Sequence, residues 1–372
     1  MKINNKNYKY KIAVIPGDGI GKEVINASLT ILKAILDLTR IKINKTIFPW
    51  GSDYFRKHGI MMPKNGVKTL LSFDAILFGA VGDPEISDDI TLWGLRLEIC
   101  QKLDQFVNLR PSKFILGFKS PLNYNLAKTI DFVIVRENSE GEYSGSGGII
   151  HKNLPNEVGT EIAIFTKIGC NRIHEYAFKL ANSRPAKTLT LITKSNAQRH
   201  GMKIWDKSFY EISKKFPKVK TDRLLVDAAT ALMVSTPEKF DVLVATNLHA
   251  DILSDLASAL LGSLGLGATA NLSLNKNIPS MFEPIHGAAF DIVGKNMANP
   301  IGALWSVALM LNDLGEKRSA DIIHKLINIY AEEGGPFTPD LGGKAGTSDV
   351  VKIFLQNLKR LNTKKISGLH LK

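Results

Sequence analysis

The segment FDVLVATNLHADILSD, residues 240–255, decides the fold class of this chain. Residues 242–245 form a continuous apolar run, which is typical of a short strand covered on both faces of a sheet. The residues DILSDLASALL (251–261) then follow with the apolar spacing of a helix. A buried strand that leads directly into a helix predicts an α/β protein.

Asp251 and Asp255 lie four residues apart and therefore on one face of the expected helix. Like charges at that spacing repel each other, so the helix gains nothing from them unless a cation lies between them. Two carboxylates beside a strand end suit Mg²⁺ or Mn²⁺, which prefer hard oxygen ligands. A solvated acidic helix face is the alternative, and this segment alone does not decide between the two.

The composition predicts a globular protein of two domains. A chain of 372 residues is too long for one ordinary core, and its 44% hydrophobic and 22% charged residues are usual proportions. No apolar stretch is long enough to span a bilayer. The N-terminal segment runs into a strand without a separate apolar region, so no signal peptide is expected. Cys100 and Cys170 have neither metal-ligand nor disulfide spacing. A cytoplasmic location is therefore expected.

The net charge of +13 raises the question of a nucleic-acid partner. The lysines are scattered, however, and only the C-terminal segment around Lys359 and Arg360 is clustered. No zinc-finger spacing, RNA-binding aromatic signature or basic-zipper pattern accompanies them. We therefore expect no nucleic-acid partner, and a positive field would instead help to collect small dianionic substrates.

Apolar strands alternate with amphipathic helices along the chain, which predicts parallel or mixed sheets flanked by helices. The expected strands are residues 11–17, 74–80, 131–137, 188–194, 223–229 and 241–247. The expected helices are residues 22–38, 174–183, 202–216, 251–261 and 301–315. Residues 143–165, with glycines and short apolar alternations, indicate an arm or a small sheet outside the main layers that serves subunit pairing.

Polar residues gather where the expected strands end. Arg136, Lys194, Asp227 and Asn247 each follow the apolar part of a different strand. In open α/β sheets, ligands bind outside the carboxyl ends of the strands. One polar residue at such a position is common, but four residues with complementary charges predict a site.

The first expected strand leads into a glycine-rich turn that resembles a dinucleotide-binding motif but does not match it. Gly17, Gly19 and Gly21 are spaced by two and two, whereas the dinucleotide fingerprint requires its third glycine at the position of Lys22. Asp37, twenty residues after Gly17, does not rescue the match. We therefore expect a tight turn near a ligand cleft and not a Rossmann fold.

Two arginines are candidates for binding a carboxylate. Arg110 precedes Pro111, which favours an extended conformation, and Arg136 opens RENSEGEYSG, with Tyr143 seven residues later. Two guanidinium groups hold a carboxylate more selectively than two lysines would. Surface ion pairing is the alternative for either arginine alone.

The segment FEPIHGAAFD has the composition of a nucleotide-binding loop. Gly287 permits a close approach of the backbone to a phosphate, His286 can stack or donate a hydrogen bond, and Asp291 can accept from a ribose diol. A structural histidine is the alternative for His286. Lys194 and Asp227 equally have surface and helix-capping alternatives.

Taken together, these segments resemble the β-decarboxylating dehydrogenases, the family of isocitrate, isopropylmalate, homoisocitrate and tartrate/D-malate dehydrogenases. The matching segments cover nearly the whole chain in order; they are IPGDGIG, NLRP, VRENSEGEYSG, TKSN, VDAAT, ATNLHADILSD, SMFEPIHGAAFDIVGKNMANPIGA and TPDLGGKAGTSDV. Within the family, DYFRKHGIMMP and TLWGLRLEICQKLDQFVNLRP are most similar to tartrate/D-malate dehydrogenases.

The resemblance implies a two-domain fold that differs from the Rossmann fold. Residues 1–105 and 262–372 would form the first, cofactor-binding domain, and residues 106–261 would form the second, with the dimerisation arm and the metal and substrate residues. The second domain would pair with its mate in a homodimer. The active site would be shared, with the positions of Lys194 and Asp227 contributed by the partner subunit.

The resemblance also implies roles for individual residues. Arg110 and Arg136 match the carboxylate clamp, and Tyr143 and Lys194 match the acid/base pair. The positions that match the metal ligands are Asp227, Asp251 and Asp255. The positions that match the cofactor loop and its supports are Glu283, His286, Gly287, Asp291, Asn299 and Asp340.

The implied cofactors are NAD and Mg²⁺ or Mn²⁺, and a requirement for a monovalent cation such as K⁺ stays open. Asp291, without a nearby lysine–tyrosine pair, resembles the relatives that use NAD, because a carboxylate favours a ribose diol and repels a 2′-phosphate. The implied reaction is oxidative decarboxylation of a 2-hydroxy dicarboxylic acid, with D-malate or tartrate as the expected substrate. The alternatives are 3-isopropylmalate as substrate and, in another class, a catalytically weak regulatory subunit.

The chain departs from the family pattern at several positions. Cys100 stands where the family has a third substrate-binding arginine, and Arg96, one helical turn away, is the candidate substitute. His249 and Ala250 replace the usual Phe-Gly before Asp251, and Phe290 replaces a proline. Loss of one charge-assisted hydrogen bond would weaken substrate binding by about 1.5–3 kcal/mol.

Overall fold

The structure of the chain is a computed structural model that describes residues 9–366. The expectation of no signal peptide rests partly on residues 1–8, which lie outside the described residues. The chain divides into two compact units. Unit 1 comprises Met1–Leu103, Ile115–Lys119 and Gly262–Lys372, and unit 2 comprises Asp104–Phe114 and Ser120–Leu261. The prediction of an α/β fold with parallel and mixed pairing is confirmed in both units.

The strands of unit 1 lie in the order β2-β1-β3-β12-β11. Their bounds are β1 (Lys9–Gly17), β2 (Lys42–Ile47), β3 (Ala75–Ala80), β11 (Ala268–Leu272) and β12 (Ser280–Pro284). β1 pairs in parallel with β2 and β3, and β12 pairs in parallel with β3, whereas β11 and β12 are antiparallel. The sequence AILFGA of β3 is buried at every position, as expected for a strand covered on both faces.

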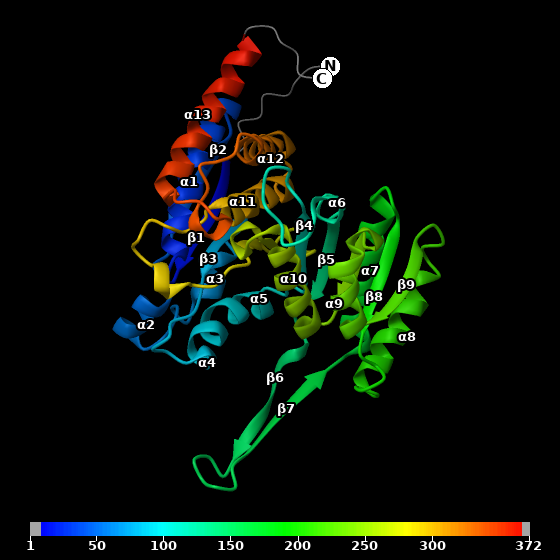
Figure 1. The fold of residues 1–372 in the computed structure, drawn as a ribbon. Coiled ribbons are helices and arrows are strands. Elements are labelled where there is room, and N and C mark those ends of the chain that lie inside the picture. Colours follow the sequence, from blue (N-terminus) through cyan, green and yellow to red (C-terminus); the bar gives the residue numbers. More distant parts are fainter. Residues whose placement is uncertain (1–8, 367–372) are drawn as a thin grey trace. The chain divides into compact units, whose positions relative to one another are not determined.

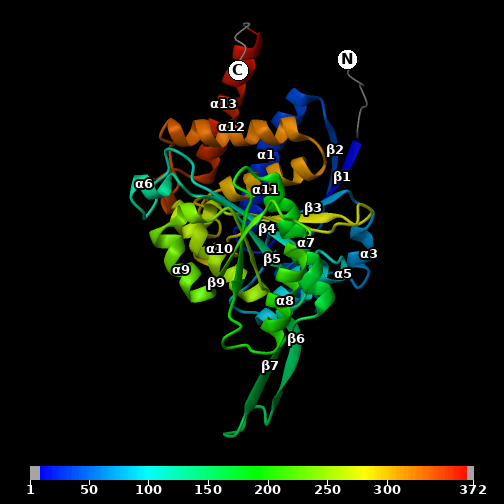
Figure 2. The ribbon, with the colours of Figure 1, turned by 90° about the vertical axis from the view of Figure 1, so that its right-hand side faces the viewer.

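Helices α1 and α11 contact the strands of unit 1, and α12 lies beside α11 (Figures 1 and 2). The helices are α1 (Gly21–Thr39), α2 (Ser52–His58), α3 (Gly66–Leu70), α4 (Asp88–Thr91), α5 (Glu98–Lys102), α11 (Ile301–Asp313), α12 (Lys317–Glu332) and α13 (Thr347–Ile366). A π-helical turn, Leu92–Leu97, connects α4 to α5. α1 buries Val24, Ile31 and Ile35, which share one face, and ends where Arg40 adopts a left-handed conformation with φ of 59°.

The strands of the unit 2 sheet lie in the order β4-β5-β10-β8-β9. Their bounds are β4 (Val107–Lys113), β5 (Asp131–Glu137), β8 (Thr188–Thr193), β9 (Lys220–Leu225) and β10 (Val242–Ala245). β10 pairs in parallel with β5 and β8, β9 pairs in parallel with β8, and β4 is antiparallel to β5. The carboxyl ends of β5, β8, β9 and β10 therefore meet at one edge of this sheet, which is where the sequence predicts a site.

Figure 2 shows α7 and α8 on one side of this sheet and α9 and α10 on the other. The helices of unit 2 are α6 (Tyr124–Ala127), α7 (Lys167–Ser183), α8 (Gly201–Ser213), α9 (Val226–Ser235) and α10 (Asn247–Leu261). The prediction of a strand over residues 223–229 is wrong in its second half, because β9 ends at Leu225 and α9 begins at Val226. The alanine-rich sequence after Asp227 favours a helix there.

An antiparallel pair, β6 (Gly141–Ile150) and β7 (Val158–Ile164), projects from the rest of unit 2 (Figure 1). Every residue of β7 is exposed, and the exposed apolar side chains of the pair are Ile149, Ile150, Val158, Ile162 and Ile164. The predicted arm over residues 143–165 is therefore present as a separate two-stranded sheet. Within the part of the chain that the structure describes, no helix is long and apolar enough to cross a membrane.

Candidate active site

Helix α10 carries Asp251 and Asp255 on one face. The positive charge that offsets the repulsion between these two carboxylates comes from an arginine of the same chain, Arg110. The Arg110 guanidinium reaches both carboxylates, with its Nη1 atom 3.1 Å from Asp251 Oδ1 and 3.9 Å from Asp255 Oδ1. Arg110 lies in β4, so the prediction of an extended conformation before Pro111 is confirmed. An arginine with 7% of its side chain exposed thus balances two partly exposed acids.

A second guanidinium converges on the same acid. Arg136, near the end of β5, donates from Nη1 to Asp251 Oδ1 and from Nε to Asn247 Oδ1 at 2.8 Å, and its side chain is 3% exposed. Asn247 begins α10 directly after β10, so two neighbouring parallel strands bring these groups together. Both arginines of the predicted carboxylate clamp therefore lie at one place.

Tyr143 completes this cluster from the start of the arm. Its hydroxyl donates to Asp251 Oδ2 at 3.3 Å, and the Arg136 guanidinium lies over its ring, 5.3 Å from the ring centre. A cation over an aromatic face is attracted by the ring quadrupole. The contact places the phenol beside the Arg136 guanidinium.

Lys194 and Asp227 form a separate pair in unit 2. Lys194 follows β8 and Asp227 lies in the first turn of α9, and Lys194 Nζ is 2.6 Å from Asp227 Oδ1. The hydrogen bond from Lys194 lowers the pKa of Asp227, so this carboxylate stays ionised. The two residues that the family resemblance assigns to the partner's site therefore lie together within one chain.

The carboxylates of Asp251, Asp255 and Asp227 suit a divalent cation if two chains contribute them to one site. Burial raises the pKa of Asp255, and the charge of Asp251 adds to this effect, so an added cation would stabilise the ionised form. Among the described residues of a single chain, no group of three or more His, Cys, Asp or Glu side chains could hold a metal. One chain thus offers two hard oxygen donors at α10 and a third, Asp227, elsewhere.

In unit 1, the expected cofactor loop follows β12 and packs against the glycine-rich turn after β1. Ile20 N donates to the Ala288 carbonyl at 2.8 Å, and a Cβ atom at Gly19 would lie 1.9 Å from the same oxygen. A Cβ at Gly287 would meet no described atom within 4 Å, so the folded chain leaves space there. The expected tight turn therefore supports a loop with room for a ligand against its backbone.

His286 and Asp291 keep polar atoms available in this loop. The Nδ1 atom of His286 contacts the Gly287 carbonyl at 3.0 Å, while its buried Nε2 atom has no partner among the described residues. Burial lowers the pKa of His286 and favours the neutral imidazole. Asp291 lies exposed on a 3₁₀ turn, where its carboxylate could accept from a ribose diol. These features fit a dinucleotide.

The remaining expected cofactor residues, Glu283, Asn299 and Asp340, are held by hydrogen bonds within unit 1. Asn299 Nδ2 donates to Asp340 Oδ2 at 2.9 Å, and Thr338 Oγ1 donates to Asp340 Oδ1 at 2.5 Å. Glu283 accepts from Arg96 Nη2 at 2.7 Å and from Asn271 Nδ2 at 2.7 Å. A direct contact of Arg96 with substrate would therefore require Arg96 to give up Glu283, and the substrate role of Arg96 stays a prediction.

The sequence motifs assigned no role to Asn108 and Ser254, the polar side chains that position Arg110. Arg110 donates from Nη1 to the Ser254 hydroxyl and from Nε to Asn108 Oδ1 at 2.9 Å. Ser254 lies one turn after Asp251, and β-sheet pairing places Asn108 opposite Arg136. The position of Ser254, three residues after Asp251 on the same helix face, was the only sequence signal that could have suggested its contact with Arg110. Serine is common on helices, however, and rarely marks a site.

Two departures from the family pattern lie in buried places. Cys100 is 1% exposed and belongs to an apolar cluster with Leu95, Ile99 and Met281. His249 is 7% exposed, and its Nδ1 atom has no partner among the described residues. Burial lowers the pKa of His249, which favours the neutral ring beside the site.

Comparison with known proteins supports the resemblance over almost the whole chain. A family model described as isocitrate/isopropylmalate dehydrogenase matches residues 11–354. A protein of Agrobacterium vitis named "probable tartrate dehydrogenase/decarboxylase" is 56% identical over 345 residues, which cover 92% of this chain and 96% of that protein. The D-malate dehydrogenase (decarboxylating) of Escherichia coli is 43% identical, with 91% of this chain and 96% of that protein covered.

The tartrate dehydrogenase/decarboxylase of Pseudomonas putida is 42% identical, with 95% of this chain and 99% of that protein covered. The crystal structure of isocitrate dehydrogenase from Methylococcus capsulatus superposes with a TM-score of 0.86 at 31% identity and covers 94% of this chain and 99% of its own. The chain belongs to the isocitrate/isopropylmalate dehydrogenase family.

Proposed function

We propose that the protein catalyses the NAD- and divalent-metal-dependent oxidative decarboxylation of a 2-hydroxy dicarboxylate, with D-malate or tartrate as substrate. The observation that carries this proposal is the convergence of Arg110, Arg136 and Tyr143 on Asp251. The relatives named as tartrate and D-malate dehydrogenases support the substrate class. The intact cluster also speaks against a catalytically weak regulatory subunit.

The charges of the cluster explain why a metal ion and a dicarboxylate would bind together. Arg110 and Arg136 balance Asp251 and Asp255, so the cluster is neutral without ligands. A dianionic substrate alone would add two negative charges, and a divalent ion alone would add two positive ones. Because uncompensated charge in a partly buried site is costly, binding of both together is favoured over binding of either alone.

The residues of the cluster have distinct expected roles. Arg110 and Arg136 would turn their guanidinium groups from Asp251 toward the substrate carboxylates, which they can hold in a bidentate fashion. Tyr143 would donate its proton to C3 after carbon dioxide leaves. When bound, the divalent ion would supply Lewis-acid polarisation of the C2 oxygen and the nicotinamide would accept the hydride.

Lys194 would accept the proton of the C2 hydroxyl. Its Nζ atom must face that hydroxyl to do so, whereas here it donates to Asp227 Oδ1 at 2.6 Å. We therefore propose that Asp227 leaves Lys194 when the site assembles and then acts as a metal ligand. Asp251 and Asp255 of one subunit and Asp227 of the other would hold the ion.

Because the metal ligands come from two subunits, the proposed site requires a homodimer. The exposed isoleucines of the arm and the exposed Leu248 and Ile252 of α10 are apolar surface that a second copy would cover. Light scattering of the purified chain measures the assembly directly, and a monomer at assay concentration would contradict the shared site.

The expected cofactor residues in the loop after β12 would hold NAD, with Asp291 at the ribose diol.

The substrate is tested by following the reduced cofactor with D-malate, tartrate, 3-isopropylmalate and isocitrate in the presence of NAD and Mn²⁺. The proposal predicts the highest kcat/KM with D-malate or tartrate and no turnover after the metal is chelated. A preference for 3-isopropylmalate would favour the alternative substrate. Turnover that persists in excess chelator would contradict the metal requirement.

A further inference from the structure

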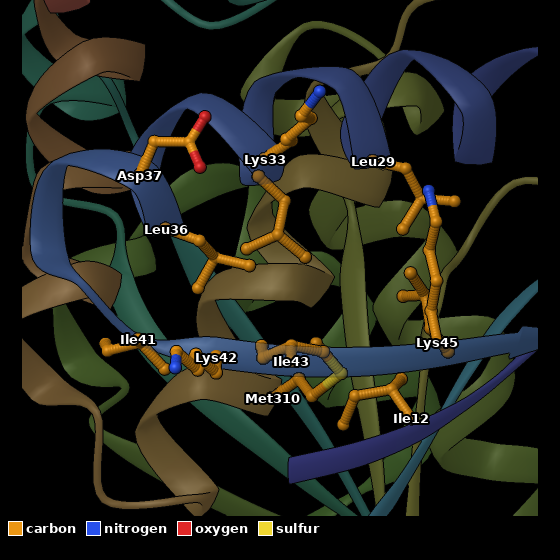
Figure 3. Close-up of a pocket in the computed structure, with 12 residues that line it drawn as sticks. Ile12, Leu29, Lys33, Leu36, Asp37, Ile41, Lys42, Ile43, Lys45 and Met310 are labelled. Atoms are coloured by element: carbon orange, nitrogen blue, oxygen red, sulfur yellow. The ribbon is translucent and has the colours of Figure 1, made fainter. Parts of the chain in front are cut away.

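A cavity lies in unit 1 between helix α1 and edge strand β2, and none of the proposed active-site residues lines it (Figure 3). Its volume is about 270 Å³. Leu29, Leu32 and Leu36 of α1 face it from one side, and Ile43 of β2 faces it from the other. Ile12 of β1 and Met310 of α11, both fully or almost fully buried, form its floor.

The cavity follows from the way α1 and β2 are joined. The helix ends at Thr39, Arg40 reverses the chain with a positive φ, and β2 returns alongside the helix. Leu29 to Asp37 of the helix spans about 12 Å at the usual rise per residue. The space between the two elements is therefore elongated and open along the edge of the sheet, which suits an extended chain better than a compact ring.

The rim of the cavity is cationic. Lys33, Lys42 and Lys45 line it with one acid, Asp37, and no carboxylate of the described residues pairs with any of the three lysines. Figure 3 shows the Lys45 side chain rising from β2 toward α1 beside Leu29, whereas Asp37 lies at the opposite end of the cavity, across from Ile41. The two ends therefore differ in charge, with a single unpaired cation at the Lys45 end.

We propose that this cavity binds a medium-chain carboxylate, with the alkyl chain along the leucines of α1 and the carboxylate at Lys45. An apolar cavity of this kind loses contacts when it is empty, and an alkyl chain restores them. The lysine at one end supplies the matching charge, while Asp37 repels a carboxylate from the other end. The site does not depend on the proposed dehydrogenase activity, because its residues take no part in that reaction.

Octanoate is the probe, and the full-length protein with ¹³C-methyl-labelled methionine reports on it. Met310 lies in the cavity wall, while Met202 and Met233 are buried in unit 2 and serve as internal controls. We expect a saturable shift of the Met310 methyl signal and no shift of the two control signals. An unchanged Met310 signal, or equal shifts at all three, would overturn the proposal.

Three variants test how octanoate is held. Ile43→Trp fills the cavity from an edge strand and should abolish the Met310 response while the thermal midpoint is retained. Lys45→Gln should weaken octanoate binding about threefold, as for one exposed charge contact, and leave binding of 1-octanol unchanged. Lys42→Gln, at the Asp37 end, should have a smaller effect than Lys45→Gln. Binding that survives Ile43→Trp, or equal affinities for octanoate and 1-octanol in the unmodified protein, would overturn the proposal.

Discussion

Replacing Arg136 with lysine tests whether the guanidinium shape, and not only its charge, serves the site. Arg136 donates to both Asn247 and Asp251 and lies over the Tyr143 ring. A lysine ammonium keeps the positive charge but cannot reach two acceptors in one plane or hold a carboxylate with two parallel hydrogen bonds. We therefore expect a folded protein with weak substrate binding.

The expected magnitude follows from the contacts that lysine cannot make. Loss of one charge-assisted hydrogen bond to the substrate costs about 1.5–3 kcal/mol, which corresponds to roughly a 10- to 150-fold fall in kcat/KM. Asn247 Oδ1 also loses its donor, which would lower the free energy of unfolding by about 1–3 kcal/mol. The loss in kcat/KM should appear mainly in KM, because the guanidinium would hold the carboxylate equally in the bound substrate and during hydride transfer.

Initial rates of NAD reduction with D-malate and tartrate measure the effect, and circular dichroism checks the fold. Arg172→Lys is the matched control, since Arg172 also lies in unit 2 over an aromatic ring, Phe106, and pairs with Asp104. The control should keep kcat/KM within about twofold, as for a surface ion pair. If Arg136→Lys shows the same small change as the control, the assignment of Arg136 to the carboxylate clamp is wrong.

Three further changes probe other parts of the chain. Tyr143→Phe should slow formation of the decarboxylated 2-oxo acid more than NAD reduction, because C3 then lacks its proton donor; formation of that 2-oxo acid in step with NAD reduction at the rate of the unmodified protein would contradict its role as the acid. Burial lowers the pKa of His174 from 6.5 to about 3. Between these two pH values the unfolded chain binds one proton more than the folded chain, so the free energy of unfolding falls as the pH falls from 6.5 to about 3. His174→Gln should remove up to about 1.4 kcal/mol per pH unit of this dependence between pH 6 and 4 in urea unfolding, whereas exposed His200→Gln should leave the slope unchanged. Cys100→Arg should destabilise unit 1 by about 3–5 kcal/mol, because the position is an apolar core and an unpaired guanidinium would be buried there; a thermal midpoint equal to that of Cys100→Ser would show that the cluster opens to solvent.

The parts of the fold that sequence predicted well are those governed by local pattern. The apolar run of β10, the apolar face of α1 and the glycine-rich arm each carry a signal within a few neighbouring residues. The prediction of a strand over residues 223–229 was wrong in its second half because a strand end and a helix start can share an apolar sequence. Only the pairing of β9 with β8 sets the boundary. The edge strand β2 was missed because its residues are mostly exposed and polar.

The sequence motifs named the residues of the candidate site, but they did not predict which of these side chains contact one another. Motifs named Arg110, Arg136, Tyr143 and Asp251, but nothing local shows that all three donors reach one carboxylate. Cys100 illustrates the same limit, since the family resemblance suggested a substrate-binding arginine at this position, while its surroundings are apolar. Such contacts join residues that are far apart in sequence, so they depend on sheet pairing.

Mixing two inactive variants tests the shared arrangement of carboxylates most directly. Asp227→Asn and Asp251→Asn should each lack Mn²⁺-dependent turnover as separate homodimers. After subunit exchange, half of the dimers would be mixed, and one of the two sites in each mixed dimer would contain no substitution, which restores about one quarter of the activity of the unmodified protein. A mixture that stays inactive although mass spectrometry shows mixed dimers, or a parent variant with full activity, would contradict a metal site built from Asp251 and Asp255 of one subunit and Asp227 of the other.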